Sequence, residues 1–287
     1  MTSRNPYLML AAAILCLSTG AILVRFTTAP PLVIAFYRLT LTALLGGLLM
    51  AGTRQSLPAR RSDMPRAGLA GLFLALHFAF WITSLSYTTV ASSVLFTNLQ
   101  VIFVIIFSAL FRKERITSRA LAGVVLALAG SAVIGGGDLL SGRLLGDVLA
   151  LIGGLMFAVY LMFGRSLRAG VEIWPYTFMV SGMAGIFLAI AMAVGSLPFG
   201  GYPLTDYIWF LLMAVLPGIG GHGILNWALK YIKAPVVAIS VLGESVGASI
   251  LGYLILHESL AWFQLLGGAM VLSGIYWAVR SEATPTP

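Results

Sequence analysis

The chain has 287 residues, of which 60% are hydrophobic and 9% are charged. Ordinary soluble domains carry roughly 25% charged residues, so this composition leaves too few polar side chains to cover a soluble protein of this size. In a soluble chain the formal net charge of +8 would indicate nucleic-acid binding, whereas in a membrane protein it fits basic loops near anionic lipid. The composition therefore predicts a multi-pass protein surrounded by membrane lipids, with no nucleic-acid partner.

Apolar runs of about 20 residues, the length that crosses a membrane, follow one another along the chain. They predict an all-α membrane protein with ten transmembrane helices, at residues 6–26, 31–51, 67–87, 90–111, 118–136, 145–165, 173–195, 206–227, 235–256 and 260–280. Residues 281–287 are expected to form a disordered tail.

Lys and Arg residues gather at alternate helix ends. If the N-terminus is cytoplasmic, fourteen of the 17 basic residues fall on the cytoplasmic side, while Arg25 and Arg143 fall outside and Arg38 lies within a helix. Cytoplasmic loops carry an excess of Lys and Arg. We therefore expect both termini to lie in the cytoplasm.

A repeat relates residues 85–130 to residues 229–274 by a shift of 144 positions. Leu85, Glu114, Gly123 and Gly130 match Leu229, Glu258, Gly267 and Gly274. Five helices per half is an odd number, so the halves at residues 1–138 and 139–280 are expected to have opposite orientations. The charges support opposite orientations, because the loop at residues 112–115 is basic whereas its counterpart at 256–259 has no Lys or Arg. Inverted repeats are a transporter architecture, although a purely structural duplication would leave the same pattern.

Ionisable residues inside membrane spans are expensive and are candidates for function. Glu244 lies near the middle of the ninth predicted helix, and its repeat partner at the same depth is Gln100. Glu244 is interpreted as a contact for a substrate ammonium or as a proton site. The alternative is a hydrogen-bonded Glu that ties two helices together. Arg38 is expected to hold a substrate carboxylate in a forked contact or to pair with a helix-end carbonyl.

Other polar and aromatic side chains are candidates for lining a central cavity. His77 and Trp81 lie four residues apart, as do His222 and Asn226, so each pair shares a helix face. The remaining candidates for substrate binding are Ser18, Thr19, Tyr37, Asn98, Tyr160 and Trp227. Such residues also pack against lipid or join transmembrane helices, and that alternative stays open for each.

Gly and Pro residues indicate moving parts. Pro217, Gly218 and Gly220 interrupt the eighth predicted helix, and Gly243 lies beside Glu244 in the ninth. We expect a gating role for these four residues, with close helix packing as the alternative for Gly243. The sequence has no HExxH, GxSxG or P-loop motif. An enzyme is therefore not expected, and no catalytic group, metal or cofactor is predicted.

Four stretches carry a resemblance to a known family: residues 108–114 with 123–130, residues 251–258 with 267–274, Phe36-Tyr37-Arg38, and Glu244. The chain resembles the drug/metabolite transporter superfamily, EamA type, and within it is similar to bacterial exporters of amino acids, including aromatic ones. Ser245 and Val101 stand where many members have proline.

The resemblance implies a bacterial inner-membrane protein that exports neutral amino acids and related metabolites by alternating access through a central cavity. Another small metabolite or a drug remains the first alternative, and a passive channel is the second. The substrate is expected to be a small molecule, and the oligomeric state is left open.

Overall fold

The computed structural model describes residues 5–57, 63–114, 116–135, 144–256 and 262–283. No strand occurs among these residues. The helices are α1 (Pro6–Arg25), α2 (Pro31–Gly52), α3 (Asp63–Ser84), α4 (Val90–Asn98), α5 (Gln100–Phe107), η1 (Ser108–Arg112), α6 (Ser118–Gly135), α7 (Leu144–Leu167), α8 (Ile173–Val194), α9 (Leu204–Met213), η2 (Ala214–Gly223), α10 (Ile224–Ala228), α11 (Ala234–Val241), α12 (Glu244–Leu256) and α13 (Trp262–Ala283).

These helices match the predicted membrane spans. Within the described residues, nine spans are long and apolar enough to cross a membrane, and α6 is a shorter apolar helix in the fifth predicted position. Three spans consist of consecutive segments: α4, α5 and η1; α9, η2 and α10; and α11 with α12. Helix α13 continues to Ala283, and residues 284–287 of the expected tail lie outside the described residues.

The largest difference in position concerns α3, predicted at residues 67–87 and found at Asp63–Ser84. Pro65 lies in its first turn, where the missing N–H leaves no helical hydrogen bond unmade, so the helix can include it. After α3 the chain turns sharply, because the N–H groups of Ser86 and Tyr87 donate to the carbonyls of Thr83 and Ser84.

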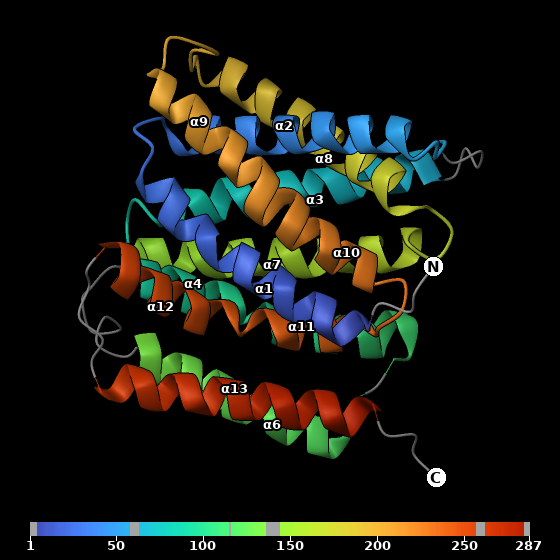
Figure 1. Ribbon diagram of the computed structural model, residues 1–287, viewed down its shortest axis with the longest axis vertical. Coiled ribbons are helices and arrows are strands. Elements are labelled where there is room, and N and C mark those ends of the chain that lie inside the picture. The colour runs from blue at the N-terminus through green and yellow to red at the C-terminus, as the bar shows by residue number, and fades with distance from the viewer. Residues whose placement is uncertain (1–4, 58–62, 115, 136–143, 257–261, 284–287) are drawn as a thin grey trace.

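The helices form one bundle (Figure 1). Helices α6 and α13 lie side by side at one edge, and α2 and α8 pack together at the opposite edge. The remaining spans run between these pairs. The start of α1 and the end of α13 lie at the same end of the bundle.

Glycines bring α6 and α13 into backbone contact. A Cβ atom on Gly123 would lie 2.6 Å from the carbonyl oxygen of Gly274, and one on Gly130 would lie 2.6 Å from that of Gly267. As the residue number rises along α6, it falls along α13, so the two helices are antiparallel. Small residues allow this close approach, and van der Waals packing of this kind drives the association of helices in lipid.

Two spans turn inside the bundle without proline. The break between α4 and α5 is at Leu99, and the break between α11 and α12 is at Leu242 and Gly243. Hydrogen bonds of the i→i+3 type replace the helical pattern there, including Leu99 N–H to Phe96 and Gly243 N–H to Ser240. Such tight turns bend a helix by local rewinding. Both spans are therefore broken at these turns, although neither turn contains a proline.

The segment around Pro217 does not interrupt its span. It forms the ten-residue π-helix η2, which is continuous with α9 and α10. Its glycines face close neighbours: a Cβ on Gly218 would lie 2.5 Å from Thr42 Oγ1, and one on Gly220 would lie 2.9 Å from Cys16 Sγ. The wide helix and its glycines thus pack tightly against α1 and α2.

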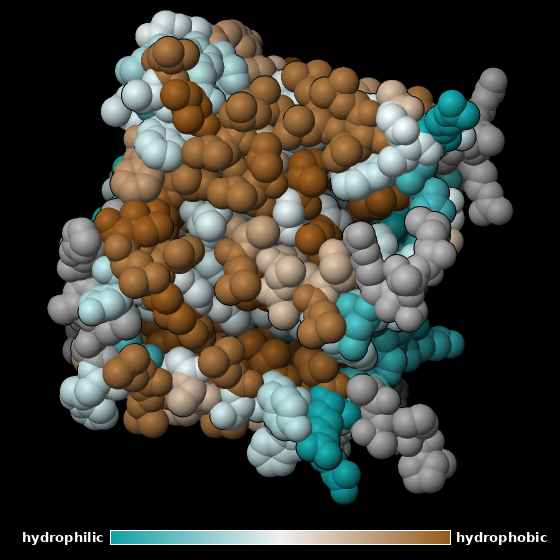
Figure 2. Space-filling view, in the orientation of Figure 1, coloured by the Kyte–Doolittle hydropathy of each residue, from teal (hydrophilic) through white to brown (hydrophobic). Residues whose placement is uncertain are grey.

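Basic side chains mark one end of the bundle, which we call the basic end: the end at which α1 begins and α13 ends. The described Lys and Arg residues at helix ends on this side are Arg54, Arg66, Arg112, Lys113, Arg119, Arg165, Arg168, Lys230, Lys233 and Arg280. Figure 2 shows hydrophilic side chains along this edge and hydrophobic ones over most of the remaining face. An apolar belt of this extent fits contact with lipid.

Acidic side chains close the opposite end. Asp147, in the first turn of α7, accepts hydrogen bonds from Thr88 Oγ1 at 2.9 Å and Ser92 Oγ at 2.8 Å. Asp206, in the first turn of α9, accepts from the backbone N–H and the hydroxyl of Thr28. Carboxylates are stabilised near helix N-termini, and each of these two ties its helix to a neighbouring segment.

We expect Gly267→Ala to destabilise the protein by about 1–3 kcal/mol, because the added methyl group would overlap backbone atoms of α6. The matched control is Gly268→Ala on the same helix, where the nearest atom would be 3.7 Å away. Thermal unfolding of the two purified variants in detergent checks this. Equal unfolding temperatures for both variants would contradict the backbone contact.

Candidate functional site

A central cavity lies in the middle of the bundle, between α1, α2, α3, α4, α5, α7, η2, α11 and α12. Its lining includes Leu17, Gly20, Arg38, His77, Phe78, Trp81, Val94, Thr97, Asn98, Gln100, Phe157, His222, Val241 and Glu244. It offers about 30 Å³ of room for the centres of water molecules, which is enough for roughly two waters. The cavity is therefore contracted, and a larger molecule enters it only if the spans move apart.

Two opposite charges face this cavity. Arg38, on α2, is 2% exposed, and its guanidinium lies 4.2 Å from the centre of the Phe78 ring and 5.9 Å from that of Trp81. Its Nε and Nη1 atoms have no hydrogen-bond partner among the described residues. Glu244 lines the same cavity from α12, and no ion pair within 4.0 Å joins it to Arg38 in the part of the chain that is described. The cavity thus holds a cation stacked on aromatic rings and a separate carboxylate.

Aromatic and imidazole rings form one wall. His77 is stacked on Trp81 with 6.3 Å between ring centres, and it also contacts Phe157 at 4.7 Å. His77 Nδ1 lies 3.0 Å from the carbonyl oxygen of Gly153. A carbonyl oxygen only accepts, so Nδ1 carries the proton, and Nε2 of the neutral ring is an acceptor. His222 from η2 completes the wall, 5.5 Å from the centre of Phe157.

The two broken spans contribute amide and carboxyl groups at their turns. Gln100 is the first residue of α5, and Glu244 is the first residue of α12. Asn98 donates a hydrogen bond of 2.8 Å to Ser245 Oγ, which joins the two turns directly. Gln100 Oε1 has no partner among the described residues. The two turns thus place amide and carboxyl side chains beside the cavity, while backbone N–H groups such as those of Leu99 and Ser245 are bonded within the turns.

A second cavity adjoins the first on its basic-end side. Its lining includes Arg38, Phe78 and His222, which it shares with the central cavity, and also Tyr160, Tyr176, Thr177, Gly218 and Asn226. Asn226 Nδ2 donates a hydrogen bond to the Tyr160 hydroxyl.

The structure gathers part of the predicted substrate-binding set around these cavities. Seven candidates line the central cavity: Arg38, His77, Trp81, Asn98, Gln100, His222 and Glu244. Tyr160 and Asn226 line the second cavity.

Four other candidates lie outside both linings. Tyr37 stacks on Phe210 with 4.8 Å between ring centres, and its hydroxyl donates to the carbonyl of Phe199, near the opposite end. Trp227 contacts Tyr231. Ser18 and Thr19 hydrogen-bond to carbonyls of their own helix, and Ser18 Oγ also lies 3.5 Å from the backbone carbonyl oxygen of Glu244.

Two of the four gating candidates lie at a cavity or at a helix break, and the other two do not. Gly218 lines the second cavity, and Gly243 forms part of the turn between α11 and α12. Pro217 and Gly220 belong to η2 but line neither cavity. Gly243 also packs closely, because a Cβ there would lie 3.2 Å from Ile14.

Several lining residues were missed by the sequence reasoning. Phe78 and Phe157 carry a weak signal, since each lies three residues before a candidate on the same helix, Trp81 and Tyr160. Tyr176 and Thr177 carry none, because they sit at the start of an apolar helix and reach the cavity only through tertiary packing.

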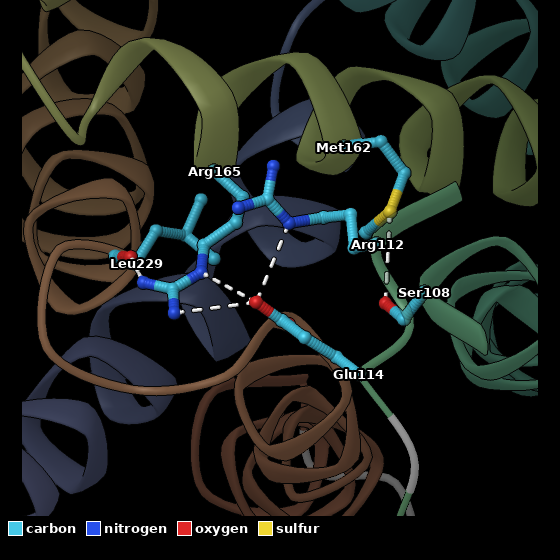
Figure 3. Close-up of polar contacts among 6 residues, drawn as sticks. All are labelled: Ser108, Arg112, Glu114, Met162, Arg165 and Leu229. Atoms are coloured by element: carbon cyan, nitrogen blue, oxygen red, sulfur yellow. Dashed lines mark hydrogen bonds and ion pairs between the residues drawn. The ribbon is translucent and has the colours of Figure 1, made fainter. Parts of the chain in front are cut away.

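A polar cluster ties the spans together at the basic end (Figure 3). Glu114 Oε1 lies 3.3 Å from Arg112 Nε and 3.4 Å from Arg165 Nε, and Arg165 also donates to the carbonyl of Leu229. Nearby, Arg168 Nε donates to the carbonyl of Asn226 at 3.1 Å. Burial lowers the pKa of the Arg168 guanidinium below its ordinary value. These contacts connect the ends of η1, α7 and α10 at the basic end.

The sequence matches the EamA-like transporter family twice, over residues 4–136 and 144–280. The chain belongs to the EamA-like transporter family. Its relatives include a protein described as an uncharacterized transporter from Archaeoglobus fulgidus, 28% identical over 90% of this chain and 91% of the relative. Another is the uncharacterized transporter YcxC of Bacillus subtilis, 28% identical over 72% of this chain and 70% of the relative.

A solved crystal structure has the same fold as this EamA-like transporter. Its TM-score is 0.81 at 18% sequence identity, covering 98% of this chain and 99% of that chain. Family membership, the apolar spans and the buried polar cavities together identify a multi-pass membrane transporter.

We expect Arg38→Met to leave stability nearly unchanged, because the cost of burying a guanidinium whose Nε and Nη1 atoms lack hydrogen-bond partners offsets its attraction to Glu244. The matched control is Arg168→Met, which would leave the carbonyls of Asn226 and Val171 without their donor and cost about 1–3 kcal/mol. Thermal unfolding in detergent compares them. A larger loss in Arg38→Met than in Arg168→Met would mean that Arg38 is a structural residue.

Proposed function

We propose that this EamA-like transporter exports neutral amino acids, including aromatic ones, from the bacterial cytoplasm across the inner membrane. One observation carries the proposal: a single buried cavity presents an unpaired guanidinium, a separate carboxylate and an aromatic wall. An α-amino acid has a carboxylate, an ammonium group and a side chain. Arg38 pairs with the first, Glu244 with the second, and Trp81 with an apolar or aromatic side chain.

Alternating access is the proposed mechanism, working between two inverted repeats at residues 1–138 and 139–280. The double match to one family over the two halves supports the duplication. The turns at Leu99 and Gly243 are 144 residues apart, the same shift as the sequence repeat. The antiparallel contact of α6 with α13 pairs Gly123 with Gly274 and Gly130 with Gly267. Exchanging the two halves turns each of these pairs into the other. Repeats of this kind exchange conformations to open a central site to either side.

The basic end is proposed to face the cytoplasm, because Lys and Arg favour that side. Export then begins when the contacts among Glu114, Arg165 and the Leu229 carbonyl separate. It ends when the contacts of Asp147 and Asp206 at the opposite end separate. The closed contacts at both ends and the contracted cavity support an intermediate between these two openings.

Counterflow tests the proposal. Proteoliposomes are loaded with unlabelled phenylalanine, and entry of labelled phenylalanine is followed without an imposed gradient. We expect transient accumulation that is reduced at least tenfold in Glu244→Gln, because an ammonium paired with a carboxylate loses about 1.5–3 kcal/mol when the charge is removed. Glu172→Gln is the control, since Glu172 is exposed and pairs with Lys230 at the surface.

The outcomes separate the alternatives. Conductance without accumulation would indicate a passive channel. If no neutral amino acid accumulates while the protein is folded, the amino-acid substrate is wrong. Competition by drugs or other metabolites would then identify the cargo.

We expect Trp81→Leu to lower transport of phenylalanine more than transport of alanine, because the ring wall is lost while an apolar side chain is kept. Stacked aromatic pairs contribute about 0.5–1.5 kcal/mol, so the ratio of the two rates should fall about threefold to tenfold. Initial rates in the same proteoliposomes measure it. An unchanged ratio would remove Trp81 from contact with the substrate side chain.

A further inference from the structure

The second cavity lies between the central cavity and the basic end. Tyr160 and Asn226 lie near the ends of α7 and α10 at the basic end, and Tyr176 lies near the start of α8 on the same side. Arg38, Phe78 and His222 line both cavities. A molecule that moves from the basic end to the central cavity therefore passes the second cavity first.

Unpaired polar atoms are concentrated in this lining. Thr177 Oγ1, Asn226 Oδ1 and both Nε and Nη1 of Arg38 have no hydrogen-bond partner among the described residues. These three side chains are 5%, 4% and 2% exposed, respectively. The Tyr176 hydroxyl faces the same lining, beside the Tyr160 hydroxyl. A buried polar group without a partner costs about 1–3 kcal/mol. Three such side chains in one lining indicate a site built for a polar occupant.

The charge of the residues that line the second cavity indicates which kind of occupant it favours. Among the described side chains that line the second cavity, Arg38 is the one that carries a full charge, and Glu244 lines the central cavity alone. Hydroxyl groups of Tyr176 and Thr177 add neutral donors beside this cation. A guanidinium with neighbouring hydroxyl donors is suited to a carboxylate.

The volume of the second cavity limits which part of the exported molecule can lie in it. The second cavity has about 20 Å³ of room for the centres of water molecules, which corresponds to roughly one or two waters. That space accepts a carboxylate group and not a whole amino acid. The body of the molecule must therefore lie elsewhere along the path while its carboxylate is held here.

We propose that the second cavity is a carboxylate-binding subsite, in which Arg38 and the hydroxyls of Tyr176 and Thr177 hold the carboxylate of the exported molecule before it enters the central cavity. The inference rests on the proposed function, because it takes the exported molecule to be a carboxylate. Arg38 borders both cavities and so keeps its contact with the carboxylate as the molecule advances.

Gly164 gives an independent way to disturb the subsite. A Cβ atom at this position on α7 would lie 2.8 Å from the Tyr176 hydroxyl and 3.7 Å from Asn226 Oδ1. A side chain there would push the hydroxyl out of place without removing it. Gly164→Ala should therefore weaken carboxylate binding in the same direction as Tyr176→Phe.

The experiment measures equilibrium binding to the purified full-length protein in detergent. The probes are L-phenylalanine, L-phenylalaninamide, which lacks the carboxylate, sodium acetate and sodium chloride. We expect Tyr176→Phe and Thr177→Val each to weaken phenylalanine and acetate binding about tenfold, as for one hydrogen bond to a charged group. Binding of phenylalaninamide should stay at the wild-type value. Tyr253→Phe is the control, because Tyr253 is 51% exposed.

Each outcome supports or overturns the subsite proposal, the export proposal or both. Wild-type affinity for phenylalanine and acetate in Tyr176→Phe, Thr177→Val and Gly164→Ala would overturn the subsite. Acetate binding that depends on Tyr176 and Thr177, without phenylalanine binding, would keep the subsite and reject the amino-acid export proposal. Chloride binding with the same dependence, and no acetate binding, would replace the carboxylate by an inorganic anion and overturn the inference. Absence of binding by every probe to the folded wild-type protein would overturn both proposals.

Discussion

Backbone amide groups inside a membrane must find hydrogen-bond partners within the protein, because lipid tails offer none. This constraint explains why the described spans are helical and why irregular backbone is confined to a few places. The turns at Leu99 and at Leu242–Gly243 lie inside the bundle and border the central cavity, where side chains and a polar occupant can satisfy the freed groups. The π-helix η2 lies beside the same cavities. These departures from the α-helix thus coincide with the polar interior, whereas the π-helix η1 lies at the basic end.

The same constraint gives the buried charges their meaning. Arg38 lies against the rings of Phe78 and Trp81, and no ion pair among the described residues joins it to Glu244, which faces the same space from another span. Separated charges in a narrow buried cavity are costly. In the proposed export of amino acids, a zwitterionic occupant would offset both costs at once, and its binding would be linked to a change in packing of the bundle. The polar contacts at the two ends are the elements that such a change would have to separate.

Tight packing and polar contacts divide the bundle into stable and separable parts. The glycines of α6 and α13 bring backbone against backbone at one edge, an arrangement that leaves little room for sliding. The clusters around Glu114 at the basic end and Asp147 at the opposite end rest on a few hydrogen bonds and ion pairs. Such contacts break and reform at lower cost than a packed apolar interface. The edge pairs therefore suit a scaffold, and the two ends suit gates.

The sequence by itself determined the number, length and order of the helices, because an apolar run of about 20 residues has few alternatives in a membrane. It also identified Arg38, His77, Trp81 and Glu244, since ionisable and aromatic side chains stand out in an apolar sequence. Only the tertiary structure decided which candidates lie together. Tyr37 stacks on Phe210 outside both cavities, whereas Tyr176, which the sequence does not distinguish from other helix residues, lines the second cavity. The physical reason is that helical periodicity fixes a residue's face on its own helix, whereas the neighbour across that face depends on how all the helices pack.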